Sequence, residues 1–121
     1  MALSRRILVL SLGIALALSS VLLAQGFSFL GPSNRFVTPN GDGYNDNVAF
    51  NFSNLSWSEV TGKIYDMTGR FVANTTPPSD IKGPLLWDGK SSNGTTVRTG
   101  VYVYVINCED NVSRGVVVVI Q

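Results

Sequence analysis

The stretch Thr99–Cys108, TGVYVYVINC, decides the fold of this chain. After its glycine it runs through six β-branched or aromatic residues, Val101–Ile106, a composition typical of a strand buried in a sheet. Side chains alternate along a strand, so one face carries Tyr102, Tyr104, Ile106 and Cys108. This face is the larger of the two and is apolar, and we therefore expect it to point into the core.

Short apolar runs separated by turn residues follow one another along the rest of the chain. The expected strands are Phe36–Val37, Val48–Phe52, Val60–Asp66, Phe71–Ala73, Leu85–Trp87, Val101–Cys108 and Arg114–Ile120. No segment after the N-terminal apolar run has the 3.6-residue period of a helix. About seven short strands at roughly ten-residue spacing predict an all-β fold, an Ig-like or fibronectin-III-like antiparallel β-sandwich.

A small set of large side chains on the inward faces is expected to anchor the core. These residues are Phe50, Ile64, Trp87, Tyr102 and Tyr104. We expect the Tyr102 hydroxyl to bond a backbone carbonyl or amide, as a tyrosine corner does. Cys108 is the single cysteine of the chain, and we expect a buried thiol that behaves as a small hydrophobe. An intermolecular disulfide is the alternative.

The N-terminus has the layout of a signal peptide. Arg5 and Arg6 precede Ile7–Ala24, an unbroken run of apolar or small residues. We therefore expect a signal peptide at residues 1–24, with an uncleaved membrane anchor as the alternative. Residues 25–35 are expected to be a lead-in linker, either a tether or a cover for a sheet edge, and residues 36–121 the sandwich domain. The protein is accordingly expected to be exported to the cell surface or medium, with the periplasm as the alternative.

The charge balance and the residue types exclude several functions. Without Arg5 and Arg6, seven basic residues face eight acidic ones, a net charge of −1. A near-neutral surface argues against binding to nucleic acid and to an anionic membrane face, so a membrane contact is expected only through the N-terminal segment, if that segment is uncleaved. The chain has no histidine and no second cysteine, so the usual nucleophilic mechanisms lack a proton acceptor. We therefore expect that the protein is not an enzyme.

One loop has the composition of a calcium site. In Thr38–Asn47, TPNGDGYNDN, oxygen ligands alternate around a glycine, as they do in EF-hand and dockerin loops. The candidate ligands are Thr38, Asn40, Asp42, the carbonyl of Tyr44, and Asp46. The bidentate glutamate that ends such loops is replaced by Ala49, which favours at most weak affinity. The alternative is an Asx-rich turn whose side chains bond their own backbone.

Several motifs in a fixed order give the chain a family resemblance. KIYDMTGR at Lys63–Arg70, LWDGK at Leu86–Lys90, Asn93-Gly94 and TGVY at Thr99–Tyr102 together resemble the Ig-like domain of the flagellar hook-capping protein. TPNGDGYND at Thr38–Asp46 resembles the opening of the gliding-motility-associated C-terminal domain, which is linked to type IX secretion and surface attachment. The resemblance covers residues 36–121 and implies a bacterial, non-enzymatic β-sandwich.

Three hypotheses for the function follow. The leading one is a structural or adhesive module at the cell surface that acts through contacts with other proteins or with its own copies. Its expected interaction edge is the last strand, at Val116, Val118 and Ile120, because a free edge offers unpaired amides and carbonyls. The alternative is a C-terminal sorting or attachment domain of the type IX kind. A further alternative is a small carbohydrate-binding module, with Tyr44 and Trp57 as the aromatic contacts. Because only a signal segment precedes the domain in this sequence, we expect a small stand-alone sandwich or a fragment of a larger protein.

Overall fold

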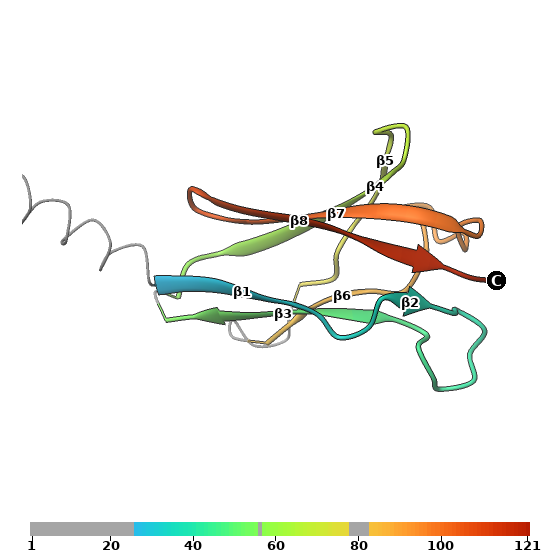
Figure 1. The fold of residues 1–121 in the computed structure, drawn as a ribbon, viewed down its shortest axis with the longest axis horizontal. Helices are drawn as coiled ribbons and strands as arrows, with labels where there is room; N and C mark the ends of the chain where they lie inside the picture. The colour runs from blue at the N-terminus through green and yellow to red at the C-terminus, as the bar shows by residue number, and fades with distance from the viewer. Residues whose placement is uncertain (1–25, 56, 78–82) are drawn as a thin grey trace, which may run out of the picture.

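Two β-sheets stacked face to face make up the domain (Figure 1). The computed structural model describes residues 26–55, 57–77 and 83–121, so the expected signal peptide lies outside the described residues. One sheet has the order β1-β3-β6, formed by Phe27–Pro32, Val48–Asn54 and Leu85–Trp87. The other has the order β2-β8-β7-β4-β5, formed by Phe36–Val37, Asn111–Val119, Gly100–Cys108, Val60–Asp66 and Phe71–Asn74. The predicted all-β sandwich is confirmed.

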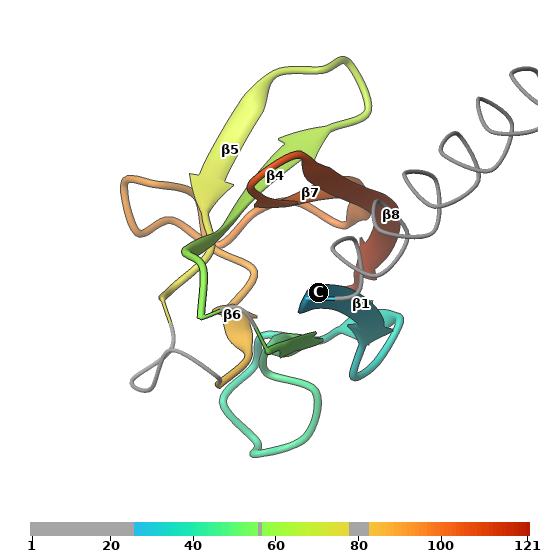
Figure 2. The same ribbon diagram turned by 90° about the vertical axis from the view of Figure 1, so that its left-hand side faces the viewer.

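The tyrosine-bearing strand β7 lies at the centre of the five-stranded sheet. It pairs antiparallel with β8 from Gly100 to Cys108 and with β4 from Tyr102 to Cys108. Successive side chains of β7 point to opposite sides of the sheet. The four that are buried are Tyr102, Tyr104, Ile106 and Cys108. Figure 2 shows the sandwich end-on, with β5 at the outer edge of this sheet.

The core lies between the two sheets and is built around aromatic contacts. Trp87 is 2% exposed, and its ring centroid lies 5.5 Å from that of Tyr102. The Trp87 indole Nε1–H donates to the carbonyl of Lys90 at 2.9 Å, and the Tyr102 hydroxyl donates to the carbonyl of Arg98 at 2.7 Å. Both polar ends therefore have backbone partners, as such groups need when they are buried. The structure places in this core all five expected anchors, Phe50, Ile64, Trp87, Tyr102 and Tyr104.

The segment expected as a lead-in linker contains a strand instead. β1 pairs antiparallel with β3, from Phe27 opposite Asn54 to Pro32 opposite Phe50. The register shifts between Phe29 and Gly31, where the glycine has φ 105°. This bulge interrupts the two-residue alternation that identifies a strand in the sequence. Among the described residues the sandwich consequently begins at Phe27, and β1 forms one edge of the three-stranded sheet.

At Val118 and Ile120, two of the three positions expected on an open edge, the end of the last strand already has a partner on that edge. β2 runs parallel beside its C-terminal part, with Phe36 opposite Val118. The Val118 N–H donates to the Arg35 carbonyl at 2.8 Å, and the Ile120 N–H donates to the Val37 carbonyl at 2.9 Å. The end of β8 is therefore paired with β7 on one side and with β2 on the other, and an incoming strand would find these amides occupied.

The chain also changes sheets after β5, on the opposite side of the sandwich. The Thr75 N–H donates to the Gly62 carbonyl of β4 at 3.0 Å. The next residue, Thr76, exchanges two backbone hydrogen bonds with Leu86 of β6, at 2.7 and 3.2 Å. Thr75 and Thr76 thus carry the backbone from the five-stranded sheet to the three-stranded one, and a groove opens beside this crossing.

Candidate functional site

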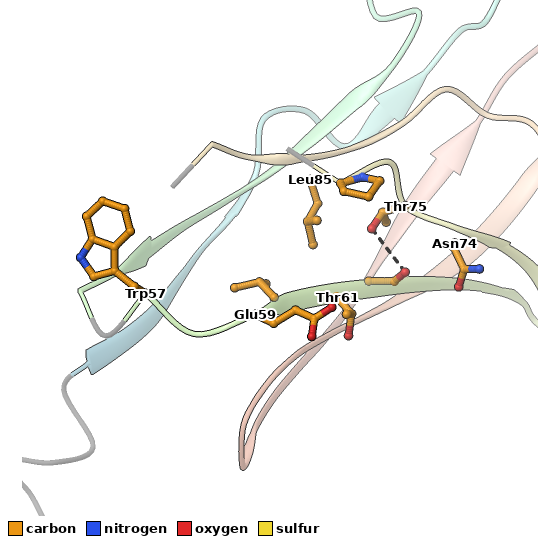
Figure 3. A pocket seen from close by; sticks show the side chains of 9 residues that line it. Trp57, Glu59, Thr61, Asn74, Thr75 and Leu85 are labelled. Carbon is orange, nitrogen blue, oxygen red and sulfur yellow. Dashed lines mark hydrogen bonds between the residues drawn. The ribbon is translucent and has the colours of Figure 1, made fainter. Parts of the chain in front are cut away.

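A groove of about 810 Å³ opens between the two sheets next to the Thr75–Thr76 crossing (Figure 3). Apolar side chains supply much of its wall, from Trp57, Val60, Pro77 and Leu85. Polar side chains complete it, from Glu59, Thr61, Asn74 and Thr75. Sequence reasoning identified only Trp57 among these, since the others come together through the change of sheets, which is a non-local feature.

Gly62 and Thr75 fix the inner wall of the groove. The Thr75 hydroxyl donates to the Gly62 carbonyl at 3.3 Å, the bond drawn in Figure 3. A Cβ built on Gly62 would lie 2.6 Å from the Thr75 Oγ1 and 3.0 Å from the Ile106 Cδ1. The glycine therefore allows the crossing chain to lie directly against β4. An isolated glycine inside a predicted strand is the signal that could have indicated this close approach.

Trp57 lies at one end of the groove, on the turn that links β3 to β4. This turn is held by the buried side chain of Asn54, whose Nδ2–H donates to the Ser58 carbonyl at 2.6 Å. The Ser58 N–H returns a bond to the Asn54 Oδ1 at 3.3 Å. Trp57 itself has φ 57°, a left-handed conformation, and its side chain is 56% exposed. The turn thus presents a large aromatic side chain at the end of the groove.

The described lining residues offer the groove mainly apolar and hydrogen-bonding contacts. Among the described residues that line the groove, Glu59 is the only one with a titratable side chain, and a general acid–base mechanism needs a positioned group with a partner. In the described part of the chain, no three His, Cys, Asp or Glu side chains gather in a way that could hold a metal ion. The groove therefore combines an exposed aromatic side chain, Trp57, with polar side chains along its wall.

The five expected calcium ligands come together in one loop, but their oxygen atoms make hydrogen bonds with backbone and side-chain groups of the loop itself. The Asp46 carboxylate accepts the N–H groups of Gly41 and Gly43 at 2.8 and 2.7 Å. The Asp42 carboxylate accepts the Tyr44 N–H at 2.8 Å, and the Asn40 Oδ1 accepts the Asp42 N–H at 3.1 Å. The remaining member, Thr38, donates its hydroxyl to the Tyr44 carbonyl at 3.2 Å. This geometry favours the Asx-turn interpretation of the loop.

The two aromatic residues expected to bind carbohydrate lie at opposite ends of β3. Tyr44 precedes this strand and Trp57 follows it. Seven strand residues at about 3.3 Å each separate them by roughly 20 Å or more. They cannot stack on one sugar ring, so only Trp57 belongs to the groove.

Asp66 is a turn residue of the β4–β5 hairpin. Its Oδ1 accepts the Thr68 hydroxyl at 2.6 Å, the Thr68 N–H at 2.9 Å and the Arg70 N–H at 3.0 Å. These bonds lower the pKa of the carboxyl below its ordinary value; the bond from the Thr68 hydroxyl has the largest effect and the bond from the Arg70 N–H the next largest. The carboxylate closes the tight turn, where Gly69 takes φ 86°.

Cys108 carries a free thiol that is 1% exposed in the core. Burial raises the pKa of this thiol, and the nearby charge of Glu109 raises it further. The thiolate is the reactive form, so both effects make the side chain inert. Its position is that of a small core hydrophobe, out of reach of a second chain.

Comparisons with known proteins place the chain in a family. The model of the CHU_C type IX secretion signal domain matches residues 31–119. A search of curated proteins gave no match. Within residues 26–55, 57–77 and 83–121, there is no helix with the length and apolarity needed to span a membrane.

The solved structures that are similar to this chain include PorZ, PorU and CopC. PorZ, a surface component of the type IX secretion system of Porphyromonas gingivalis, is 20% identical over 74% of this chain with a TM-score of 0.55. The latent PorU dimer of the same organism is 25% identical over 62% of this chain, with a TM-score of 0.41. CopC from Methylosinus trichosporium OB3b is 17% identical over 77% of this chain and 92% of its own, with a TM-score of 0.46.

The likeness to PorZ shows a shared fold, and this chain corresponds to only 11% of PorZ and 8% of PorU. The family model, in contrast, extends from the bulge in β1 to the last residue of β8. The chain therefore belongs to the family of CHU_C type IX secretion signal domains.

Proposed function

We propose that residues 27–121 act as a type IX secretion signal domain that directs the protein carrying it to the cell surface. The observation that carries this proposal is the family match over residues 31–119, which includes seven of the eight strands in full. The sorting role, which the sequence suggested as the alternative, thereby becomes the first candidate.

The physical character of the domain supports a recognition role. A signal domain of this kind is a non-enzymatic module, and the groove beside Trp57 offers contact surfaces without a base and nucleophile pair. In the proposed route, residues 1–24 bring the chain across the inner membrane, and the folded sandwich is then recognised for delivery to the surface.

Fusion of residues 27–121 to a passenger tests the proposal. The fusion carries an N-terminal signal peptide, a monomeric fluorescent passenger and the domain, and it is expressed in a host with a working type IX system. We expect the passenger at the cell surface or in the medium, and in the periplasm of the same host without its type IX translocon. The passenger without the domain is the control. A passenger kept in the periplasm of the competent host, with the domain folded and protease-resistant, would contradict the proposal.

Trp57 supports a second candidate, a small carbohydrate-binding module. Its exposed side chain lies at the end of the groove that also contains the polar side chains of Glu59 and Asn74. A glycan array with the purified domain tests this candidate, with Trp57→Ala expected to abolish binding and Tyr44→Ala, at the other end of β3, to leave it unchanged. An array without signal for the wild-type domain would remove the candidate.

The structural or adhesive role is a third candidate, supported by exposed apolar residues on the five-stranded sheet, including Val101 and Val116. In its self-assembling form it requires association of the purified domain. Light scattering over a dilution series measures this, and a monomer at every concentration would exclude self-assembly.

A further inference from the structure

The outward face of the five-stranded sheet carries a continuous apolar patch. On this face Val103 lies opposite Val116 of β8 and Tyr65 of β4. Tyr65 in turn lies opposite Phe71 of β5, and their ring centroids are 6.0 Å apart. One pair further along, Val101 lies opposite Val118, which pairs with Phe36 of β2. The outer-face patch is defined as Phe36, Tyr65, Phe71, Val101, Val103 and Val116.

The outer-face patch is unusual for the solvent side of a sheet. Antiparallel strands normally alternate between apolar residues inside and polar residues outside. Here the exposed fractions are 54% for Val116, 51% for Phe36 and 44% for Phe71. At about 4.8 Å per strand, a patch across five strands is roughly 20 Å wide. Single exposed apolar residues need no explanation, but a contiguous patch of this width marks an interaction surface.

Basic side chains flank the outer-face patch. Val105 of β7 lies opposite Lys63 on one side and Arg114 on the other, and both basic side chains are exposed. The outward positions of β4, β7 and β8 carry no carboxylate between Thr61 and Tyr65, Val101 and Asn107, or Val112 and Val118. The face therefore combines an apolar area with positive charge.

We propose that this face docks a protein partner whose contact surface is apolar and is flanked by carboxylates. The inference rests on the proposed secretion function, and the partner is then a component of the export machinery. Aromatic and arginine side chains beside aliphatic ones are the composition of an interface centre. The carboxylates of the partner would pair with Lys63 and Arg114 and steer the approach.

Charge argues against two other occupants of the face. A second copy stacked on the same face would bring Lys63 and Arg114 of both copies together with no outward carboxylate between them, and unpaired charges buried in an interface are costly. An anionic membrane surface would also meet Glu59, Glu109 and Asp110, which lie at the opposite end of the same sheet. The net charge of −1 without Arg5 and Arg6 gives little overall attraction to such a membrane.

The proposal is tested by measuring export of the passenger fusion when single residues on the outer face of its domain are substituted. Val116→Glu places a carboxylate in the outer-face patch, and Arg114→Glu reverses one flanking charge. We expect each to lower surface delivery about tenfold, which corresponds to ~1.4 kcal/mol of lost contact energy. The matched controls are Val112→Glu, a 50% exposed valine of the same strand outside the patch, and Lys90→Glu, an exposed charge reversal on a loop. Thermal melting of each purified domain verifies that it is folded.

A photo-crosslinking residue at position 116 of the same fusion identifies the occupant. The expected product is an adduct with a type IX component, mapped to a segment that contains both apolar residues and carboxylates, and it should be lost when the residue is placed at position 112. An adduct with a second copy, an adduct with lipid only, or normal export of both Val116→Glu and Arg114→Glu would overturn the proposal. If the wild-type fusion itself stays in the periplasm, the secretion function fails first. If the wild type and the face variants are all exported, only the docking face fails.

Discussion

Tyr104 lies across the β7–β8 ladder directly over Gly115, its register partner. A Cβ built on Gly115 would be 2.2 Å from the Tyr104 hydroxyl oxygen and 2.4 Å from the ring carbon Cζ. The ring therefore occupies the space that any larger residue would need. Tyr104 also contacts Phe50 and Phe29, at centroid distances of 4.8 and 5.7 Å. The glycine thus sets the position of the ring on which the two sheets meet.

Gly115→Ala should destabilise the domain, because the new methyl group must displace a packed tyrosine ring. Overpacking of this kind costs about 1–3 kcal/mol of unfolding free energy. Urea denaturation followed by tryptophan fluorescence measures the change. The matched control is Gly100→Ala on β7, where the nearest atom to a new Cβ is 3.9 Å away. Equal loss in the two variants would show that the effect comes from the strand backbone and not from Tyr104.

The two-residue alternation predicted most of the sandwich. In Tyr102–Cys108 and Val48–Phe52 it identified both the strand and its buried face, because one side of each strand packs into the core. It missed β1, where the bulge at Gly31 interrupts the pattern. It also placed the start of β8 at Arg114 instead of Asn111, since the hairpin end is exposed and polar.

The features that depend on chain crossings could not be predicted from local pattern. The two residues of β2 pair with β8 across some eighty residues of sequence, and the segment around β2 binds the amides of Val118 and Ile120 on the edge that was expected to be open. The groove likewise depends on Thr75 meeting Gly62 after β5 leaves its sheet. The composition of Thr38–Asn47 suits both a calcium loop and an Asx turn. The two interpretations differ in whether the carboxylate oxygens accept backbone N–H groups of the loop, as those of Asp46 do, and the composition does not show this.

Gly62→Ala should also destabilise the domain, through Thr75. The new Cβ would lie 2.6 Å from the Thr75 Oγ1 and 2.8 Å from its Cγ2, so an overpacking cost of about 1–3 kcal/mol is expected. Thr75→Ala removes both of these atoms. The double variant should therefore lose less than the sum of the two single changes, and a double-mutant cycle in urea measures this coupling. Additive losses would mean that the clash lies with Ile106 instead.

Stability should fall in alkaline solution, with a contribution from Cys108. Burial raises the pKa of this thiol in the folded state, so the native protein holds the proton more tightly than the unfolded chain. The contribution is fully present below the unfolded value of about 8.5 and is lost as pH rises through the folded value. Burial raises the pKa of Tyr102 and Tyr104 as well, which adds the same loss above about pH 10.

Cys108→Ala separates these contributions. Its unfolding free energy should be lower than that of the wild type at pH 7, because a buried side chain is shortened, but it should stay level up to about pH 10. The wild-type value should begin to fall near pH 8.5. Urea titrations at a series of pH values measure both profiles, and parallel profiles for the two proteins would exclude a role for the thiol.

Calcium should leave the stability of the domain unchanged, while loss of the Asp46 carboxylate should lower it. Both Asp46 oxygens accept backbone N–H groups, from Gly41 and Gly43, and a side chain used in this way closes the loop without a metal ion. Asp46→Ala should cost about 0.5–1.5 kcal/mol for the lost bonds, whereas Asp110→Ala, at the β7–β8 turn, serves as the exposed control. Thermal melting with calcium well above ~10⁻³ M tests the metal directly, since a ligand of the native state raises the midpoint. A rise in the wild type that disappears in Asp46→Ala would show that the carboxylate leaves the backbone to bind the ion, and the Asx-turn interpretation would then be wrong.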